Sequence, residues 1–315
     1  MRHHLVCFGL IGVVLGSATG ASEPADGTWL YTQRGTGFGV KGIGLVVYDY
    51  QGNLIVLARA SELVNLDGGY ERPAPDAFEP QDRLLAKYGP DQRLFAVRKV
   101  GETDFPHICQ LVADRNGDVY CTGYSDRDIR LFMDGEELRL SNRGRADFFL
   151  LKWTADMRLA FGRHFGGPGY ESSCGLALDP RGHIVLVGEF AGALDLPSEG
   201  GAITLQTADS KRDIFVLKLD RTGTTLWARH ASGAASLLPP GVGVDEQGNC
   251  YVTGGFEPTL RFTGGPRPCV LTSRGGWDFF LARYDADGGL AWARDGGGSE
   301  NDYGVRVLLD KTGYS

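Results

Sequence analysis

The chain has 315 residues, which is enough for one large all-β domain or for two domains of ordinary size. Its composition is 42% hydrophobic and 23% charged, so it can bury a core, and its 47 glycines indicate many tight turns. The formal net charge of −7 argues against a general nucleic-acid-binding protein, because phosphate backbones are bound by basic surfaces.

Residues 1–21 have the pattern of a secretory signal peptide. Arg2 precedes an apolar run from Leu5 to Leu15, and small residues continue to Ala21. The run is well short of the roughly 20 residues that a membrane-spanning helix needs. We therefore expect a protein that is secreted or held at the cell envelope, with no membrane insertion after cleavage.

A repeat organises the rest of the chain. The motif D-x-x-G recurs with separations of 65, 65, 66 and 65 residues between its aspartates. The carboxylate can accept N–H bonds inside a tight turn, and glycine suits the last position, where positive φ is often required. The predicted turn residues are Asp49, Gly52, Asp114, Gly117, Asp179, Gly182, Asp245, Gly248, Asp310 and Gly313.

Two further phrases keep the same spacing. One begins at Asp82, Asp147, Asp213 and Asp278, as in "DIFVLKLD", and the other follows it, as in "TLWARH" around Trp227. Each unit therefore contains four strands. "DIFVLKLD" is apolar on both faces, with Ile214 and Val216 on one side and Phe215, Leu217 and Leu219 on the other, so both faces must be covered. Small sheets stacked around an axis achieve this, and the fold class is an all-β, four-stranded β-propeller.

The expected domain organisation is a propeller over residues 22–315. Its blades are expected at about 36–100, 101–166, 167–232 and 233–298, with a partial unit at 299–315. The segment around Tyr31 has the register of a fourth strand with no blade before it. Four complete units, a leading strand and a truncated fifth unit predict an incomplete ring, and we expect a fragment of a longer chain.

The repeated phrases resemble the bacterial seven-bladed β-propeller (SBBP) repeat. The likeness covers residues 28–315 and is strongest in "DEQGNCYVTGGF" and "DFFLARYDADGGLAW" of the last complete unit. It implies a β-propeller of a secreted or surface-associated protein, and it assigns no catalytic or binding residue. The unit that starts at Asp49 lacks the Y-V-T-G phrase, and its connection from Ser61 to Gln81 is atypical.

Residues that could perform chemistry have structural interpretations. The mature chain keeps five cysteines without metal-binding spacing, and we expect them to be small apolar strand residues, with one disulfide as the alternative. His164 and His230 occupy equivalent positions at outer strand edges, where solvent exposure is expected in place of a metal site. The aspartates are explained by turns, because the helices and the glutamate of a calcium-binding EF-hand are missing. The paired Glu136 and Glu137 fall in a hairpin connection. We expect no metal, no cofactor and no catalytic residue.

Three functions remain open at this stage. The first is a non-catalytic module that binds an extracellular protein or a glycan through its variable connections, Asp126–Ala146, Ala191–Arg212 and Glu257–Trp277. The second is a passive spacer in a larger surface protein. The third is an extracellular lyase or glycosidase with a site on the propeller axis. We favour the first and expect no enzyme and no nucleic-acid partner.

Overall fold

A computed structural model describes residues 45–59, 82–91, 93–101, 106–133, 136–208, 211–235 and 239–309. Within these ranges the regular elements are all strands, and the all-β prediction is confirmed. The predicted signal peptide, the strand around Tyr31 and the turn residues Asp310 and Gly313 lie outside the described residues.

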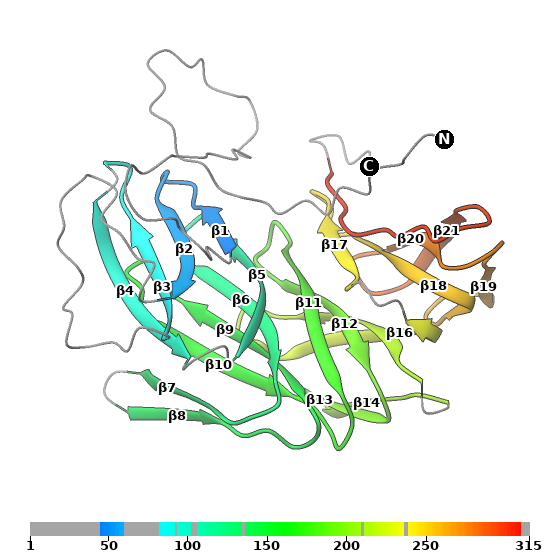
Figure 1. Cartoon of the computed structure of the whole chain (residues 1–315), viewed down its shortest axis with the longest axis horizontal. Coiled ribbons are helices and arrows are strands. Elements are labelled where there is room, and N and C mark those ends of the chain that lie inside the picture. Colours follow the sequence, from blue (N-terminus) through cyan, green and yellow to red (C-terminus); the bar gives the residue numbers. More distant parts are fainter. Residues whose placement is uncertain are drawn as a thin grey trace, which may run out of the picture.

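The main strands form four antiparallel units of four strands each, which we call blades 1 to 4 (Figure 1). Blade 1 contains β1 (Leu45–Tyr48), β2 (Leu54–Arg59), β3 (Arg83–Tyr88) and β4 (Leu94–Gly101). Blade 2 contains β5 (His107–Ala113), β6 (Val119–Ser125), β9 (Asp147–Trp153) and β10 (Leu159–Phe165). Blade 3 contains β11 (Glu171–Leu178), β12 (Ile184–Phe190), β15 (Asp213–Leu219) and β16 (Thr225–Ala235). Blade 4 contains β17 (Gly241–Val244), β18 (Cys250–Phe262), β20 (Asp278–Tyr284) and β21 (Leu290–Gly296).

Adjacent blades pack face to face through three seams, which we call seams 1/2, 2/3 and 3/4. Each seam is filled by its own apolar cluster, with side chains from both blades. Strand β15 shows why its sequence is apolar on both sides. Ile214 and Val216 are buried in seam 3/4, whereas Phe215, Leu217 and Leu219 are buried in seam 2/3. The blades thus form the curled stack of an incomplete β-propeller, as predicted.

The two ends of the blades differ in character. The D-x-x-G turns join the first strand to the second, and further short turns join the third to the fourth, so antiparallel pairing places all of them at one end. We call this the turn end. The opposite end carries the links between blades and the long variable connections, and we call it the connection end.

Three of the variable connections contain added strands. The hairpins are β7 (Ile129–Met133) with β8 (Glu136–Leu140), and β13 (Ala193–Ser198) with β14 (Gly201–Gln206). In blade 4 the far half of β18 pairs with β19 (Cys269–Thr272). These units lie against the outer strands of the two blades that they separate. Their inner side chains, such as Leu131, Leu194 and Leu260, are buried in the seam clusters.

The outer edges of blades 3 and 4 are joined directly. The end of β16 pairs antiparallel with the far half of β18, from Ala231 opposite Phe262 to Ala235 opposite Phe256. This pairing merges the two blades into one continuous hydrogen-bonded sheet. The added strands of the variable connections therefore fill the space between adjacent blades at their outer edges. Only the outward faces of these strands remain available to a partner.

Candidate ligand-binding surface

The turn end is built from local hydrogen bonds. Asp49 Oδ1 accepts the backbone N–H of Gln51 at 3.0 Å and of Asn53 at 2.9 Å. The same pair of bonds is made by Asp114, Asp179 and Asp245. The glycines have φ values of +80°, +84°, +79° and +85°, which other residues rarely adopt; they are Gly52, Gly117, Gly182 and Gly248. These aspartates and glycines stabilise the turns in which they lie.

Two of these aspartates also anchor buried lysines. Lys87 Nζ lies 2.9 Å from Asp49 Oδ2, and Lys218 Nζ lies 3.0 Å from Asp179 Oδ2. Lys218 also donates to the carbonyl of Ala286 in the next blade, at 3.3 Å. Burial would raise the pKa of Asp179, but the bonds from the His183 N–H and from Lys218 outweigh it and lower that pKa. The turn end is thus occupied by interactions that join the blades.

The outer-strand histidines are not solvated, and that prediction is wrong. The His164 side chain is 11% exposed, and its Nε2 lies 2.8 Å from Asp147 Oδ2. His230 is 22% exposed and lies 4.0 Å from Asp213. Burial lowers the pKa of His230. Each histidine instead faces the aspartate that begins the third strand of its own blade, because β9–β10 and β15–β16 pairing brings them together.

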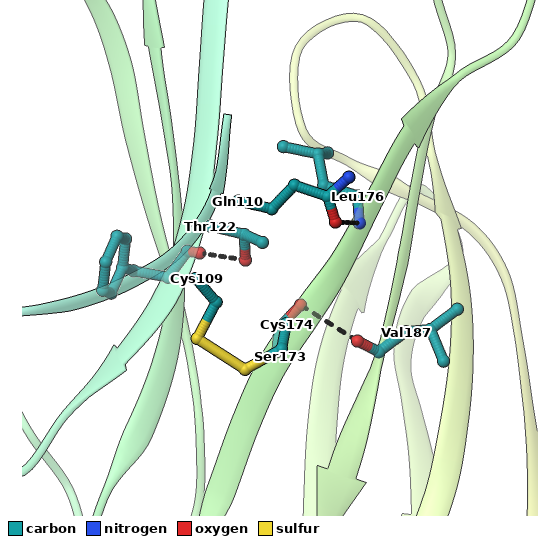
Figure 2. Close-up of a disulfide and its surroundings, with 8 residues drawn as sticks. Cys109, Gln110, Thr122, Ser173, Cys174, Leu176 and Val187 are labelled. Atoms are coloured by element: carbon teal, nitrogen blue, oxygen red, sulfur yellow. Dashed lines mark hydrogen bonds between the residues drawn. A yellow bond between two sulfur atoms is a disulfide. The ribbon is translucent and has the colours of Figure 1, made fainter. Parts of the chain in front are cut away.

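The expectation that every cysteine is an unpaired apolar residue is also wrong. Cys109 of β5 and Cys174 of β11 form a disulfide between the innermost strands of blades 2 and 3, with Cα atoms 4.8 Å apart (Figure 2). Beside it, Gln110 Oε1 accepts the Leu176 N–H at 2.9 Å, so two links cross the same seam. Cys121 and Cys250 are buried, and burial raises the pKa of Cys250 to about 12. These two match the apolar interpretation.

A row of rings in contact crosses seam 2/3 at the connection end. His107 at the start of β5 stacks on Tyr124 near the end of β6, with ring centroids 4.8 Å apart. Tyr124 lies 6.0 Å from Tyr170, and the Arg212 guanidinium lies 3.9 Å over the Tyr170 ring. Arg212 also pairs with Glu189 at 3.2 Å. We call His107, Tyr124, Tyr170 and Arg212 the ring row.

The ring row is accessible and polar at its edges. His107 and Arg212 are exposed, whereas Tyr124 and Tyr170 are half-buried. Burial is the main cause that raises the pKa of Tyr124, and the neighbouring Tyr170 adds to it. The row therefore offers two phenol rings between a histidine and an arginine, a combination suited to aromatic and hydrogen-bonding contacts with a partner.

The repeat places a second aromatic pair at the same end of blade 4. Trp277 immediately precedes β20, as Arg212 precedes β15, and Tyr303 holds the position of His107 three repeats later. Their ring centroids are 6.4 Å apart, and the angle between the ring planes is 29°. Asn301 Oδ1 accepts the backbone N–H of Trp277. Aromatic rings near the inner strands are thus a recurrent feature of this end.

The remaining sequence candidates are exposed or unassembled. Glu137 pairs with Arg130 across the β7–β8 hairpin at 3.5 Å, and the side chain of Glu136 is outside the described part. Within the described ranges, no three His, Cys, Asp or Glu side chains are arranged to hold a metal ion. In the same ranges, no helix is long and apolar enough to cross a membrane.

Comparison with known proteins gives one distant similarity. The chain is 26% identical over 126 residues to an uncharacterised WD repeat-containing protein of Acanthamoeba polyphaga mimivirus. The match covers 38% of this chain and 9% of that protein. No family model matches the chain, so the SBBP resemblance stays a prediction. Together with the curled four-stranded sheets, the WD similarity supports a propeller-like repeat fold.

The sequence reasoning missed the ring row. Its four members come from four different segments, and only the packing of blade 2 against blade 3 brings them together. For the disulfide a signal was present: Cys109 and Cys174 are 65 residues apart, which is one repeat, so they occupy the same place on adjacent innermost strands.

Proposed function

We propose that this chain is a non-catalytic, extracellular protein-binding module whose partner contacts the ring row at the connection end. Tyrosine and arginine, with tryptophan, are enriched among the side chains that carry most of the binding energy at protein interfaces. Here both types are in contact, with Arg212 exposed and the two tyrosines half-buried. The ring row is the observation that carries the proposal.

The position of the ring row on the scaffold supports this function. The turn end is occupied by ion pairs and carbonyl contacts between blades, and the inner faces of the hairpins are buried between blades. The connection end, in contrast, carries rings held by strand ends and connections of blades 2 and 3. Recognition residues commonly lie on segments that a rigid scaffold positions in this way.

The proposed extracellular location rests on the Cys109–Cys174 link. Disulfides persist in oxidising compartments and are rare in the cytosol. Two cysteines one repeat apart and in bonding position on adjacent blades suit such a compartment. The predicted signal peptide over residues 1–21 points the same way from an independent part of the chain.

Affinity capture with matched variants tests the proposal. The mature protein and its Tyr170→Ala and Arg212→Ala variants are immobilised and exposed to an extract of secreted and envelope proteins. Tyr50→Ala is the control, because Tyr50 is 71% exposed at the turn end. We expect a specific protein that the control retains and that each ring-row variant binds at least about tenfold more weakly.

Other outcomes would redirect the assignment. Retention of purified polysaccharide, lost in the same ring-row variants, would make the ligand a glycan. Capture of a partner that all variants retain equally would overturn the ring row as the binding surface. Failure of the native protein to retain either class of ligand would favour the passive spacer.

A further inference from the structure

Two buried carboxyl groups meet in seam 2/3 beneath the ring row. Glu171, the first residue of β11, is fully buried, and Asp147, the first residue of β9, is 1% exposed. Asp147 Oδ2 accepts the Arg143 N–H at 2.7 Å and faces His164, while Glu171 Oε2 accepts the Gly167 N–H at 3.0 Å. The other oxygens, Asp147 Oδ1 and Glu171 Oε1, are buried and accept no hydrogen bond.

The backbone places these two carboxyl groups next to each other, because the residues before them, Ala146 and Tyr170, form a parallel bridge and the Glu171 N–H donates to the Ala146 carbonyl at 2.7 Å. Burial raises the pKa of Glu171, and the Asp147 carboxyl adds to this. Two carboxylates repel, but a carboxylate and a carboxylic acid form a strong hydrogen bond when they share a proton. Asp147 Oδ2 already accepts the Arg143 N–H and lies beside His164. Glu171 has one backbone N–H. The proton therefore belongs on Glu171, which donates it to Asp147.

The other charged groups around the pair are engaged with other partners or contribute only backbone N–H groups. On blade 3, Glu189 of the adjacent strand β12 is paired with Arg212, which covers Tyr170. From the segment before β9, Arg143 and Arg145 contribute backbone N–H groups, to Asp147 and to the Gly169 carbonyl. From β10, His164 Nε2 lies 2.8 Å from Asp147 Oδ2.

The loop that links blades 2 and 3 wraps tightly around the pair. A Cβ atom on Gly166 would lie 2.2 Å from the Asp147 carboxyl carbon, and one on Gly169 would lie 2.7 Å from Glu171 Oε1. The loop ends at Tyr170, whose carbonyl accepts the Ala191 N–H at 3.0 Å. A repulsion between the two carboxylates would therefore act first on residues 166–170.

We propose that one proton shared by Asp147 and Glu171 locks the loop of residues 166–170, and that its loss at higher pH loosens Tyr170 and with it the ring row. All parts of this lock lie in seam 2/3. Its effect on ligand binding rests on the proposed function, but the lock itself does not. Burial, with the Asp147 charge adding to it, raises the pKa of Glu171 to about 7, which brings the transition to neutral pH.

Hydrogen exchange of the intact chain tests the lock without any ligand. Protection of the amides of residues 166–170, corrected for intrinsic exchange, is measured from about pH 5.5 to about pH 8.5. We expect protection in the native protein to fall at least about tenfold across this range. In Glu171→Gln the fall is expected to vanish, because the amide donates to Asp147 at every pH.

A matched control comes from the next equivalent loop. Gly298 N–H donates to Asp302 Oδ2 at 2.9 Å, as Gly167 does to Glu171, but Asp302 is half-buried. Asp302→Asn should leave the exchange of residues 166–170 as in the native protein. Infrared spectra provide a second readout: a protonated carboxyl band present near pH 6 should disappear near pH 8.5 and be missing in Glu171→Gln.

Several results would overturn the lock. They are protection of residues 166–170 that does not change with pH, an equal fall in Glu171→Gln, or absence of the carboxyl band from the native protein. Protection at high pH that is restored by Ca²⁺ alone would show that a cation, and not a proton, joins the two carboxyl groups. Loss of partner capture in the ring-row variants together with any of these results would support the proposed function and refute the lock.

Discussion

Seam 1/2 and seam 3/4 solve the same packing problem with opposite choices of residue. In seam 3/4 the large Trp227 of β16 meets Gly288, and its indole N–H donates to the Ala286 carbonyl at 3.0 Å. In seam 1/2 the position of Trp227 is held by Ala96, and the position of Gly288 is held by Met157. The volume is thus supplied from the opposite blade.

This exchange explains an unusual backbone. Met157 has φ of +63°, a conformation normally left to glycine, and its side chain is fully buried in the cluster of seam 1/2. The burial of methionine offsets a strain of about 1 kcal/mol. Seam 2/3 follows the pattern of seam 3/4, with Phe161 and Gly223. Each seam therefore pairs one large and one small residue.

Blade 4 repeats the large residue of this pair, but the described residues include no further blade that packs against its outer side. Trp292 holds the position of Trp227, and it lines a groove between residues 265–271 and 290–294 at the outer edge of the blade. In the same blade Phe279 is 40% exposed, whereas the equivalent Ile214 is buried in seam 3/4. Packing against a neighbouring blade, and not the blade sequence alone, therefore buries the side chains at these equivalent positions.

The substitution Gly288→Met should have the largest effect on stability. A Cβ atom there would lie 2.6 Å from the Trp227 ring, and φ is +84°. We expect a loss of about 4 kcal/mol in the free energy of unfolding, measured by urea denaturation. In the double variant with Trp227→Ala, which recreates the residues of seam 1/2, the loss should be smaller than the sum of the two single losses. Strict additivity would contradict the exchange of volumes.

Removal of the disulfide should have the next largest effect. The link closes a separation of 65 residues and holds only seam 2/3 among the described seams. We expect the Cys109→Ala, Cys174→Ala double variant to lose about 3 kcal/mol relative to the oxidised protein. Calorimetry with and without a reductant checks this, since the reductant should affect the native protein and leave the double variant unchanged.

The buried lysines provide a comparison of similar chemistry at two depths. Lys218 and Asp179 are nearly inaccessible, whereas Lys152 is 16% exposed and pairs with Asp118, which is 19% exposed. Lys218→Met should cost about 3 kcal/mol, because it leaves a buried carboxylate without its partner, and Lys152→Met about 1 kcal/mol. Equal costs in urea denaturation would show that burial of the pair does not decide its contribution.

The smallest expected effect is the pH dependence of seam 2/3. Because the folded state raises the pKa of Glu171 from 4.5 to about 7, its contribution to stability is complete below the lower value and is lost as pH rises through the higher one. The free energy of unfolding of the native protein, relative to Glu171→Gln, should fall by about 2 kcal/mol between about pH 5 and about pH 8. His230 has the opposite sign, since its lowered pKa removes stability as pH falls, and it cancels in this difference.

Much of the fold follows from local sequence. Hydrogen bonds within four or five residues explain the D-x-x-G turns, and the apolar character of β15 on both faces requires sheets on both sides. What local sequence misses depends on contacts between blades. The partners of His164 and Cys109 and the neighbours of Tyr170 lie in other strands, so the register between strands and seams must be known first.

The connection end as the binding face is the central claim, and site-specific photocrosslinking tests it most directly. A photoreactive phenylalanine analogue replaces Tyr124 in the ring row or Tyr50 at the turn end, and each protein is irradiated in the extract of secreted and envelope proteins. We expect a single partner to crosslink at position 124 and nothing specific at position 50. A partner that crosslinks at position 50 and not at position 124 would contradict the account.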